Sequence, residues 1–139
     1  MKNKRIISLL LILCLALSLC ACGKEEAPDL WESALYTENT ELGDGAITVT
    51  VLVQAEEKSV SFTIHTDCTI LGDALMEHGL VAGEMGEFGL YIKQVNGITA
   101  DYDTDQSYWG FYQNGEYMMS GVDGTEITGG ESYELVRTK

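Results

Sequence analysis

The chain has 139 residues, of which 8 are basic and 22 are acidic, so its formal net charge is −14 at pH 7. A surface this acidic repels the phosphates of nucleic acids and of anionic lipids, and it excludes nucleic acid as a partner. Solubility is the simpler reason for the charge, and an electrostatic funnel for a cation is the alternative.

Residues 1–21 have the form of a lipoprotein export signal. Three basic residues precede an apolar run over residues 6–19, which is too short for a membrane-spanning helix. Cys22 follows the small Ala21, and Leu19 is aliphatic. We therefore predict a lipid anchor on Cys22 and an extracytoplasmic protein attached to the cell membrane. An ordinary cleaved signal and an apolar N-terminal anchor are the alternatives.

The cysteines exclude a disulfide within the mature chain. Cys14 and Cys20 leave with the signal and Cys22 is modified, so Cys68 is the last thiol. Its place just before an apolar helical segment favours a small buried side chain over a nucleophile.

Residues 22–43 are expected to form the lipidated tether. Four apolar residues within 30–35 recur at helical spacing, so part of the tether is a candidate for one short docked helix. The domain proper is expected over residues 44–139. Its first two strands, over residues 47–54 and 59–65, alternate apolar and polar residues and predict an antiparallel hairpin.

A helix follows the first hairpin. Thr69 is the expected N-cap, Asp73 lies in the first turn, and Gly79 is the expected end. The remaining strands are expected at residues 90–95, 98–100, 107–113, 116–119 and 132–137. Asn-Gly pairs at 96–97 and 114–115 predict two tight hairpins, because both residues tolerate positive φ.

This order of elements predicts an α+β fold. It indicates a β-grasp-like, mostly antiparallel sheet with one helix packed across one face, which leaves the opposite face free for a partner.

An acidic loop contains the alternating carboxylates Asp101, Asp103 and Asp105. This spacing begins an EF-hand loop, but Gln106 replaces the required Gly and Tyr112 replaces the bidentate Glu. A solvated loop is the favoured interpretation, with a weak Ca²⁺ site as the alternative. His65, Cys68 and His78 lack zinc-ligand spacing, so no metal site is predicted.

The segment after this loop is rich in aromatic residues. On a strand, Trp109 and Phe111 share one face while Tyr108 and Tyr112 share the other. We expect one pair beneath the helix and the other in contact with a ligand. The candidate ligand-binding residues are Tyr108, Trp109, Tyr112 and Tyr117, because aromatic groups with polar tips are common in recognition surfaces.

The sequence Ser-Tyr-Trp-Gly-Phe-Tyr at 107–112, followed by Ser-Gly-Val-Asp at 120–123, resembles the transcobalamin-like C-terminal domain family. Bacterial lipoproteins with a free-standing domain of this kind are especially similar. The resemblance implies a β-grasp domain that binds a soluble ligand, with cobalamin or a related corrinoid as the leading candidate. The helical barrel that closes over cobalamin in the vertebrate members is absent here.

No phosphate-binding glycine loop or nucleophile motif occurs in the sequence, and we predict that the protein is not an enzyme. We expect a non-enzymatic ligand-binding module that needs no cofactor. The alternative function is an accessory module that binds an envelope protein or a glycan at the cell surface.

Overall fold

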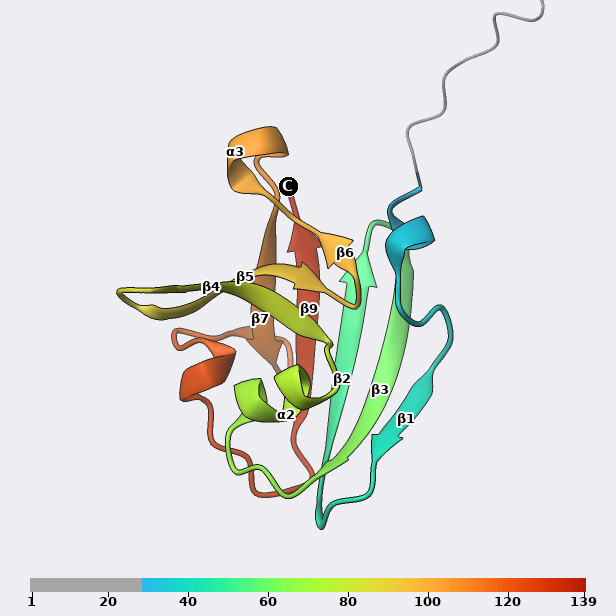
Figure 1. The fold of residues 1–139 in the computed structure, drawn as a ribbon, viewed down its shortest axis with the longest axis vertical. Helices are drawn as coiled ribbons and strands as arrows, with labels where there is room; N and C mark the ends of the chain where they lie inside the picture. The colour runs from blue at the N-terminus through green and yellow to red at the C-terminus, as the bar shows by residue number, and fades with distance from the viewer. Residues whose placement is uncertain (1–28) are drawn as a thin grey trace, which may run out of the picture.

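A six-stranded mixed sheet forms the larger layer of the structure (Figure 1). The computed structural model describes residues 29–139, so the predicted signal and Cys22 lie outside the described residues. The strands are β1 (Thr40–Gly43), β2 (Ile47–Ala55), β3 (Lys58–Thr66), β7 (Tyr108–Gln113), β8 (Glu116–Tyr117) and β9 (Ser132–Thr138), in the order β1-β3-β2-β9-β7-β8.

Two of the strand pairs in this sheet are parallel. β1 runs parallel to β3 and β2 runs parallel to β9, whereas β2–β3, β7–β9 and β7–β8 are antiparallel. The α+β class is confirmed and most strand pairs are antiparallel, as predicted, but the two parallel pairs make the larger sheet mixed. The parallel pairs join segments far apart in sequence, which local alternation of residues does not indicate.

A second layer covers one face of this sheet. It contains the helix α2 (Leu71–Glu77) and the sheet β4 (Val81–Gly86), β5 (Gly89–Val95) and β6 (Ile98–Thr99), as Figure 1 shows. The predicted hairpin closed by Asn96-Gly97 is confirmed as β5 and β6, whereas β4 was not predicted, because it contains two glycines and lacks an alternating pattern. Within residues 29–139, no helix has both the length and the apolar composition to cross a membrane.

The core lies between the two layers. Alternate residues of β2 and β3 face it, and each is at most 2% exposed: Val49, Val51, Val53, Val60, Phe62 and Ile64. Their neighbours on both strands are half-exposed on the outer face. The predicted first hairpin is therefore confirmed, with its apolar side buried as the period of two requires.

Two boundaries differ from prediction. Ile70, not Thr69, occupies the N-cap of α2 and makes no side-chain capping bond. An isolated bridge pairs Ile70 with Glu126, and this holds the helix start instead. The sheet begins at Thr40, within the segment expected to be a tether, because β1 pairs along β3.

The first described residues are also docked onto the domain. A short 3₁₀ helix, η1 (Leu30–Ser33), lies where a short helix was considered. Its Trp31 is 6% exposed and donates from Nε1 to the carbonyl of Ala55 at 3.1 Å. This buried indole attaches the segment to the end of β2.

Candidate functional site

The strand β7 separates the candidate aromatic residues between two environments. Trp109 and Phe111 are each 8% exposed and face the core, where Phe111 stacks on Tyr133 with ring centroids 5.6 Å apart. Tyr108 and Tyr112 are half-buried on the outer face. The predicted alternation of buried and outward-facing side chains is present.

Tyr117 joins the outer group. β8 pairs Tyr117 opposite Tyr112, and their rings meet edge to face with centroids 5.5 Å apart. Tyr117 is 60% exposed. Trp109, the fourth candidate, lies on the other side of β7, so it is not part of this surface. Its Nε1 is buried without a hydrogen-bond partner among the described residues.

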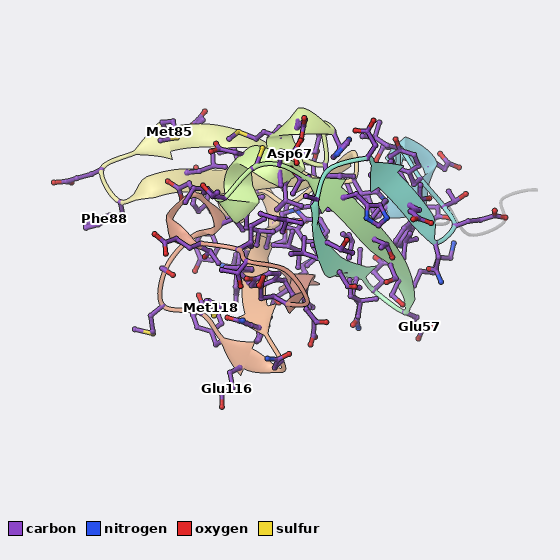
Figure 2. The ribbon with its side chains drawn as sticks, turned by 90° about the horizontal axis from the view of Figure 1, so that it is seen from below. Glu57, Asp67, Met85, Phe88, Glu116 and Met118 are labelled. Atoms are coloured by element: carbon purple, nitrogen blue, oxygen red, sulfur yellow. The ribbon has the colours of Figure 1, made fainter. Side chains whose placement is uncertain are left out.

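The outer face of the larger sheet bears mainly small polar side chains besides the tyrosines. Register places Leu52 beside Glu134, and Glu134 opposite Tyr112. The second layer lies wholly on the other side, as Figures 1 and 2 show, so no element within residues 29–139 covers this face. We call Tyr108, Tyr112 and Tyr117 the tyrosine face.

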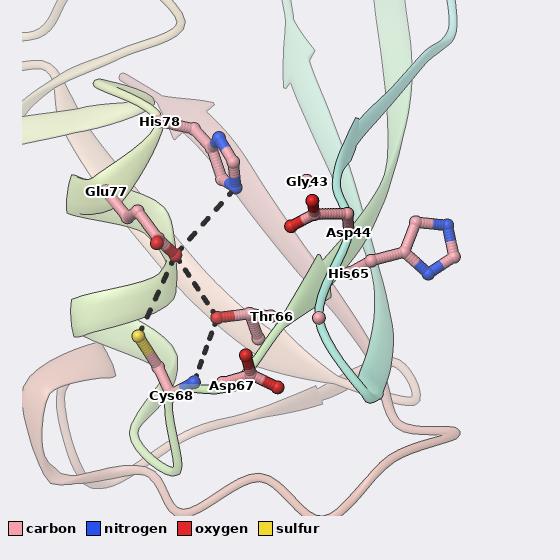
Figure 3. A pocket seen from close by; sticks show the side chains of 9 residues that line it. Gly43, Asp44, His65, Thr66, Asp67, Cys68, Glu77 and His78 are labelled. Carbon is pink, nitrogen blue, oxygen red and sulfur yellow. Dashed lines mark hydrogen bonds and ion pairs between the residues drawn. The ribbon is translucent and has the colours of Figure 1, made fainter.

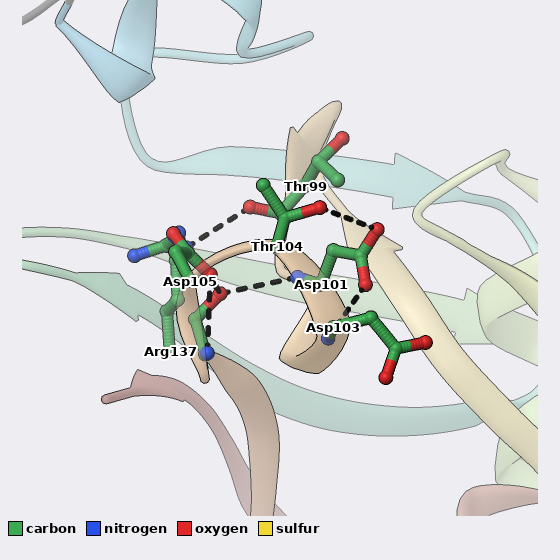
Figure 4. Close-up of polar contacts among 7 residues, drawn as sticks. Thr99, Asp101, Asp103, Thr104, Asp105 and Arg137 are labelled. Atoms are coloured by element: carbon green, nitrogen blue, oxygen red, sulfur yellow. Dashed lines mark hydrogen bonds and ion pairs between the residues drawn. The ribbon is translucent and has the colours of Figure 1, made fainter.

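The acidic loop folds on itself (Figure 4). It forms one helical turn, α3 (Tyr102–Asp105), whose N-cap Asp101 accepts hydrogen bonds from the Asp103 amide and the Thr104 hydroxyl. The Asp105 carboxylate accepts from Ser107 and, at 2.9 Å, from Arg137. The Ser107 hydrogen bond and the Arg137 guanidinium hold the pKa of Asp105 below its ordinary value.

Two of the three loop carboxylates are thus occupied as internal hydrogen-bond acceptors. No group of three His, Cys, Asp or Glu side chains within residues 29–139 is placed to hold a metal ion. Asp101 and Asp105 therefore stabilise the turn and its contact with Arg137 on β9.

A cavity of about 320 Å³ lies between the end of β3 and α2 (Figure 3). Cys68 Sγ lies 3.8 Å from Glu77 Oε2, and His78 Nε2 lies 4.0 Å from the same oxygen. Cys68 is half-exposed rather than buried. His65 turns away from this group, and its Nδ1 lies 2.9 Å from the Thr48 hydroxyl. His65 and His78 therefore do not contact a common atom.

A second exposed surface was missed at the sequence level. Three large apolar side chains are almost fully in solvent: Met85 is 74% exposed, Phe88 98% and Met119 96%. Met85 and Phe88 lie at the end of the β4–β5 hairpin, which projects beyond the larger sheet (Figure 2). The signal available in the sequence was a large apolar residue flanked by glycines at two places, Met85 and Phe88. We call these three residues the tip patch.

The fold and surfaces together define a small α+β domain with an uncovered, tyrosine-bearing sheet face. A family model described as Domain of unknown function (DUF4430) matches residues 69–133. A protein from Ruminococcus gnavus ATCC 29149, provisionally named as metal-binding, has a crystal structure, and its sequence is 34% identical to this chain. The match covers 67% of this chain and 97% of that one, with a TM-score of 0.63.

The chain belongs to the same family as that Ruminococcus gnavus protein. Haptocorrin, solved in complex with Cbi, shares the fold at 20% identity and a TM-score of 0.54. That match covers 67% of this chain but only 25% of haptocorrin, so the chain corresponds to about a quarter of the larger protein. No curated protein matches the chain.

Proposed function

We propose that this protein is an extracytoplasmic lipoprotein, held at the cell membrane by a lipid on Cys22, that acts as a non-enzymatic ligand-binding module. Its domain is of the transcobalamin-like, β-grasp type, and cobalamin or a related corrinoid is the leading ligand. The observation that carries this proposal is the tyrosine face, which no described element covers.

The chemistry of this face suits a broad, flat, partly polar ligand. The Tyr112 and Tyr117 rings form an edge-to-face pair, which fixes their orientation before a ligand arrives. Their hydroxyl groups add hydrogen bonds at the rim of an apolar contact. The haptocorrin complex supports a corrinoid because a related fold is solved with Cbi.

A titration with cobalamin tests this function. The unlipidated chain from residue 23 is mixed with increasing cobalamin, and tryptophan fluorescence reports binding because Trp109 lies directly behind the tyrosine face. Tyr117→Ala should weaken binding by about 2 kcal/mol, as truncation of a recognition aromatic does. Glu57→Ala, in the exposed turn at the other end of the sheet, is the matched control.

Saturable binding that is lost in Tyr117→Ala and kept in Glu57→Ala supports the proposal. Absence of binding at millimolar cobalamin, or binding that Tyr117→Ala leaves intact, would refute it. Thermal melting of both variants accompanies the titration. Both side chains are exposed, so both variants should melt within a few degrees of the parent.

The anchor has its own test. Metabolic labelling with a palmitate analogue should mark the full chain and Cys20→Ser, but not Cys22→Ser, because Cys22 follows the small Ala21 whereas Cys20 follows the bulky Leu19. Label that survives in Cys22→Ser contradicts the assignment.

A further inference from the structure

We propose that the tip patch is a docking surface for a protein partner that presents an apolar pocket bordered by basic side chains. This goes beyond ligand binding at the tyrosine face, because the tip patch lies on a different part of the molecule. It rests on the exposure, the fixed geometry and the charge of the β4–β5 hairpin and of the segment before the 3₁₀ turn η2 (Val122–Gly124).

The apolar face of the β4–β5 hairpin packs on the core at one end and is exposed to solvent at the other. The register of β4 and β5 shifts between Ala82 and Gly83, so Lys93 has no residue opposite it on β4. A one-residue shift reverses which side chains face the core. As a result Val95, Ile92 and Leu90 all contact the core cluster, although they are not evenly spaced.

Met85 continues this row beyond the protein body. It pairs directly opposite Leu90, so both side chains lie on the same face of the hairpin. Leu90 packs against the core, whereas Met85 is 74% exposed and Phe88 at the turn is 98% exposed. The apolar face therefore extends past the surface that could bury it.

Asp123 fixes the hairpin to the body. Its Oδ2 accepts a hydrogen bond from the Leu90 amide at 3.1 Å. Gly89 has φ of 102°, and a Cβ there would lie 2.5 Å from the same carboxylate oxygen. At Gly121 a Cβ would lie 2.8 Å from Asp123 Oδ1. The carboxylate thus sits against both glycines, and the hairpin and the Met119 segment meet around one side chain.

This arrangement prepares the surface for binding. Met119 is 96% exposed and lies two residues before Gly121, so its segment lies beside the same carboxylate as the hairpin. Little ordering of the backbone is then left to oppose association. Methionine and phenylalanine together are also adaptable contact groups.

The charge around the patch selects the partner. The exposed Glu84 and Glu87 form the acidic rim on the hairpin. Lys93 on β5 pairs with Glu84 at 3.5 Å, whereas Glu87, next to Phe88, pairs with no basic side chain among residues 29–139. A basic border on the partner complements this rim. A second copy of the chain and an anionic membrane would both bring negative charge to the patch, and both are disfavoured.

Site-specific photo-crosslinking in the cells that make the protein tests this surface. A photoreactive phenylalanine derivative replaces Phe88, Met119 or, as the control, Glu57 in the β2–β3 turn. We expect one discrete protein adduct from positions 88 and 119 and none from position 57. The crosslinked protein is then identified, purified and titrated with this chain.

The titration decides the proposal. Phe88→Ser should weaken binding at least tenfold, and the double reversal Glu84→Lys with Glu87→Lys should weaken it further and reduce its salt dependence. Glu57→Lys should leave it unchanged. Asp123→Asn should also weaken it, because the carboxylate that holds the hairpin is lost, while cobalamin binding stays as in the parent.

Four outcomes overturn the proposal: no adduct at position 88, an adduct of twice the chain's own mass, a lipid adduct, or equal binding of Phe88→Ser and the parent. Failure of cobalamin binding alone leaves the docking surface standing, since Phe88 is not part of the tyrosine face.

Discussion

The two hairpins closed by Asn-Gly have the same turn chemistry and opposite surroundings. Asn96 and Gly97 adopt φ of 51° and 77°, and Asn114 and Gly115 adopt 50° and 81°. Yet Asn96 is completely buried, whereas Asn114 is exposed. The dipeptide determines the turn in both places, and the tertiary structure alone determines how much stability depends on it.

The buried turn holds the N-terminal segment. Asn96 Nδ2 donates to the Tyr36 carbonyl at 2.8 Å, and Asn96 Oδ1 accepts from the Tyr36 amide at 3.0 Å. The Asn96 carbonyl also accepts from the Leu35 amide at 2.9 Å. One side chain therefore satisfies both main-chain groups of a residue sixty positions away.

Alanine at the two glycines should give the largest contrast. A Cβ on Gly97 would lie 2.2 Å from the Ser33 carbonyl oxygen, whereas nothing lies within 4 Å of one on Gly115. Gly97→Ala should displace the segment that buries Trp31 and lower the free energy of unfolding by at least about 4 kcal/mol. Gly115→Ala carries only the positive-φ penalty, about 1–2 kcal/mol. Urea denaturation measures both, and equal losses would show that the buried turn does not hold this segment.

Alanine at the two asparagines should give the next contrast. Asn96→Ala leaves the Tyr36 amide and carbonyl without partners, and each such group costs about 1–3 kcal/mol when buried. A loss of about 3 kcal/mol is expected, against less than about 1 kcal/mol for Asn114→Ala. Proteolysis near residue 36 should also accelerate in Asn96→Ala alone. Unchanged proteolysis there would contradict the proposed attachment.

Lowering the pH should have the smallest effect on the free energy of unfolding. The effect should arise near the buried Asn96-Gly97 turn, where Arg137 contacts β6 and Asp105. Arg137 donates to the Thr99 carbonyl on β6 at 3.0 Å and pairs with Asp105. The Ser107 hydrogen bond and Arg137 lower the pKa of Asp105 in the folded state. Its contribution to stability is therefore present above the ordinary value of 3.8 and is lost as the pH falls through the lower folded value.

Stability measured from pH 6 to pH 2 checks this. The difference between the parent and Asp105→Asn should shrink below about pH 4. Asp103→Asn, at an exposed carboxylate of the same turn, is the control and should stay close to the parent throughout. A constant difference between the parent and Asp105→Asn over the whole range would contradict the linkage.

Much of the fold follows from local signals. Both Asn-Gly hairpins, the β2–β3 hairpin and α2 are confirmed, because period-two alternation, 3.6-residue spacing and turn residues act over a few neighbours. The alternation of buried and outward-facing side chains along β7 was also anticipated. β1 and β4 were missed because one has four residues and the other has two glycines, so neither shows a period.

The surfaces were less predictable. Aromatic content drew attention to Trp109, which the structure buries, while the two methionines and the phenylalanine of the tip patch carried no periodic signal. The exposure of Met85 and Phe88 depends on the hairpin extending past the body, which no local pattern encodes. The acidic loop resembled a metal site because spacing alone does not show that Asp105 is paired with Arg137.

The position of β9 has a consequence for how the domain forms. This strand, residues 132–138, lies between β2 and β7, and its parallel pairing joins Thr50 to Ser132. Such long-range pairing is slow, because a long loop must close before any stabilising contact forms. Until residue 138 has emerged, the β2–β3 hairpin has no neighbour on its β2 side. Under the proposed export through a membrane from the N-terminus, the native sheet would close only after β9 has crossed, and the earlier strands would stay open until then.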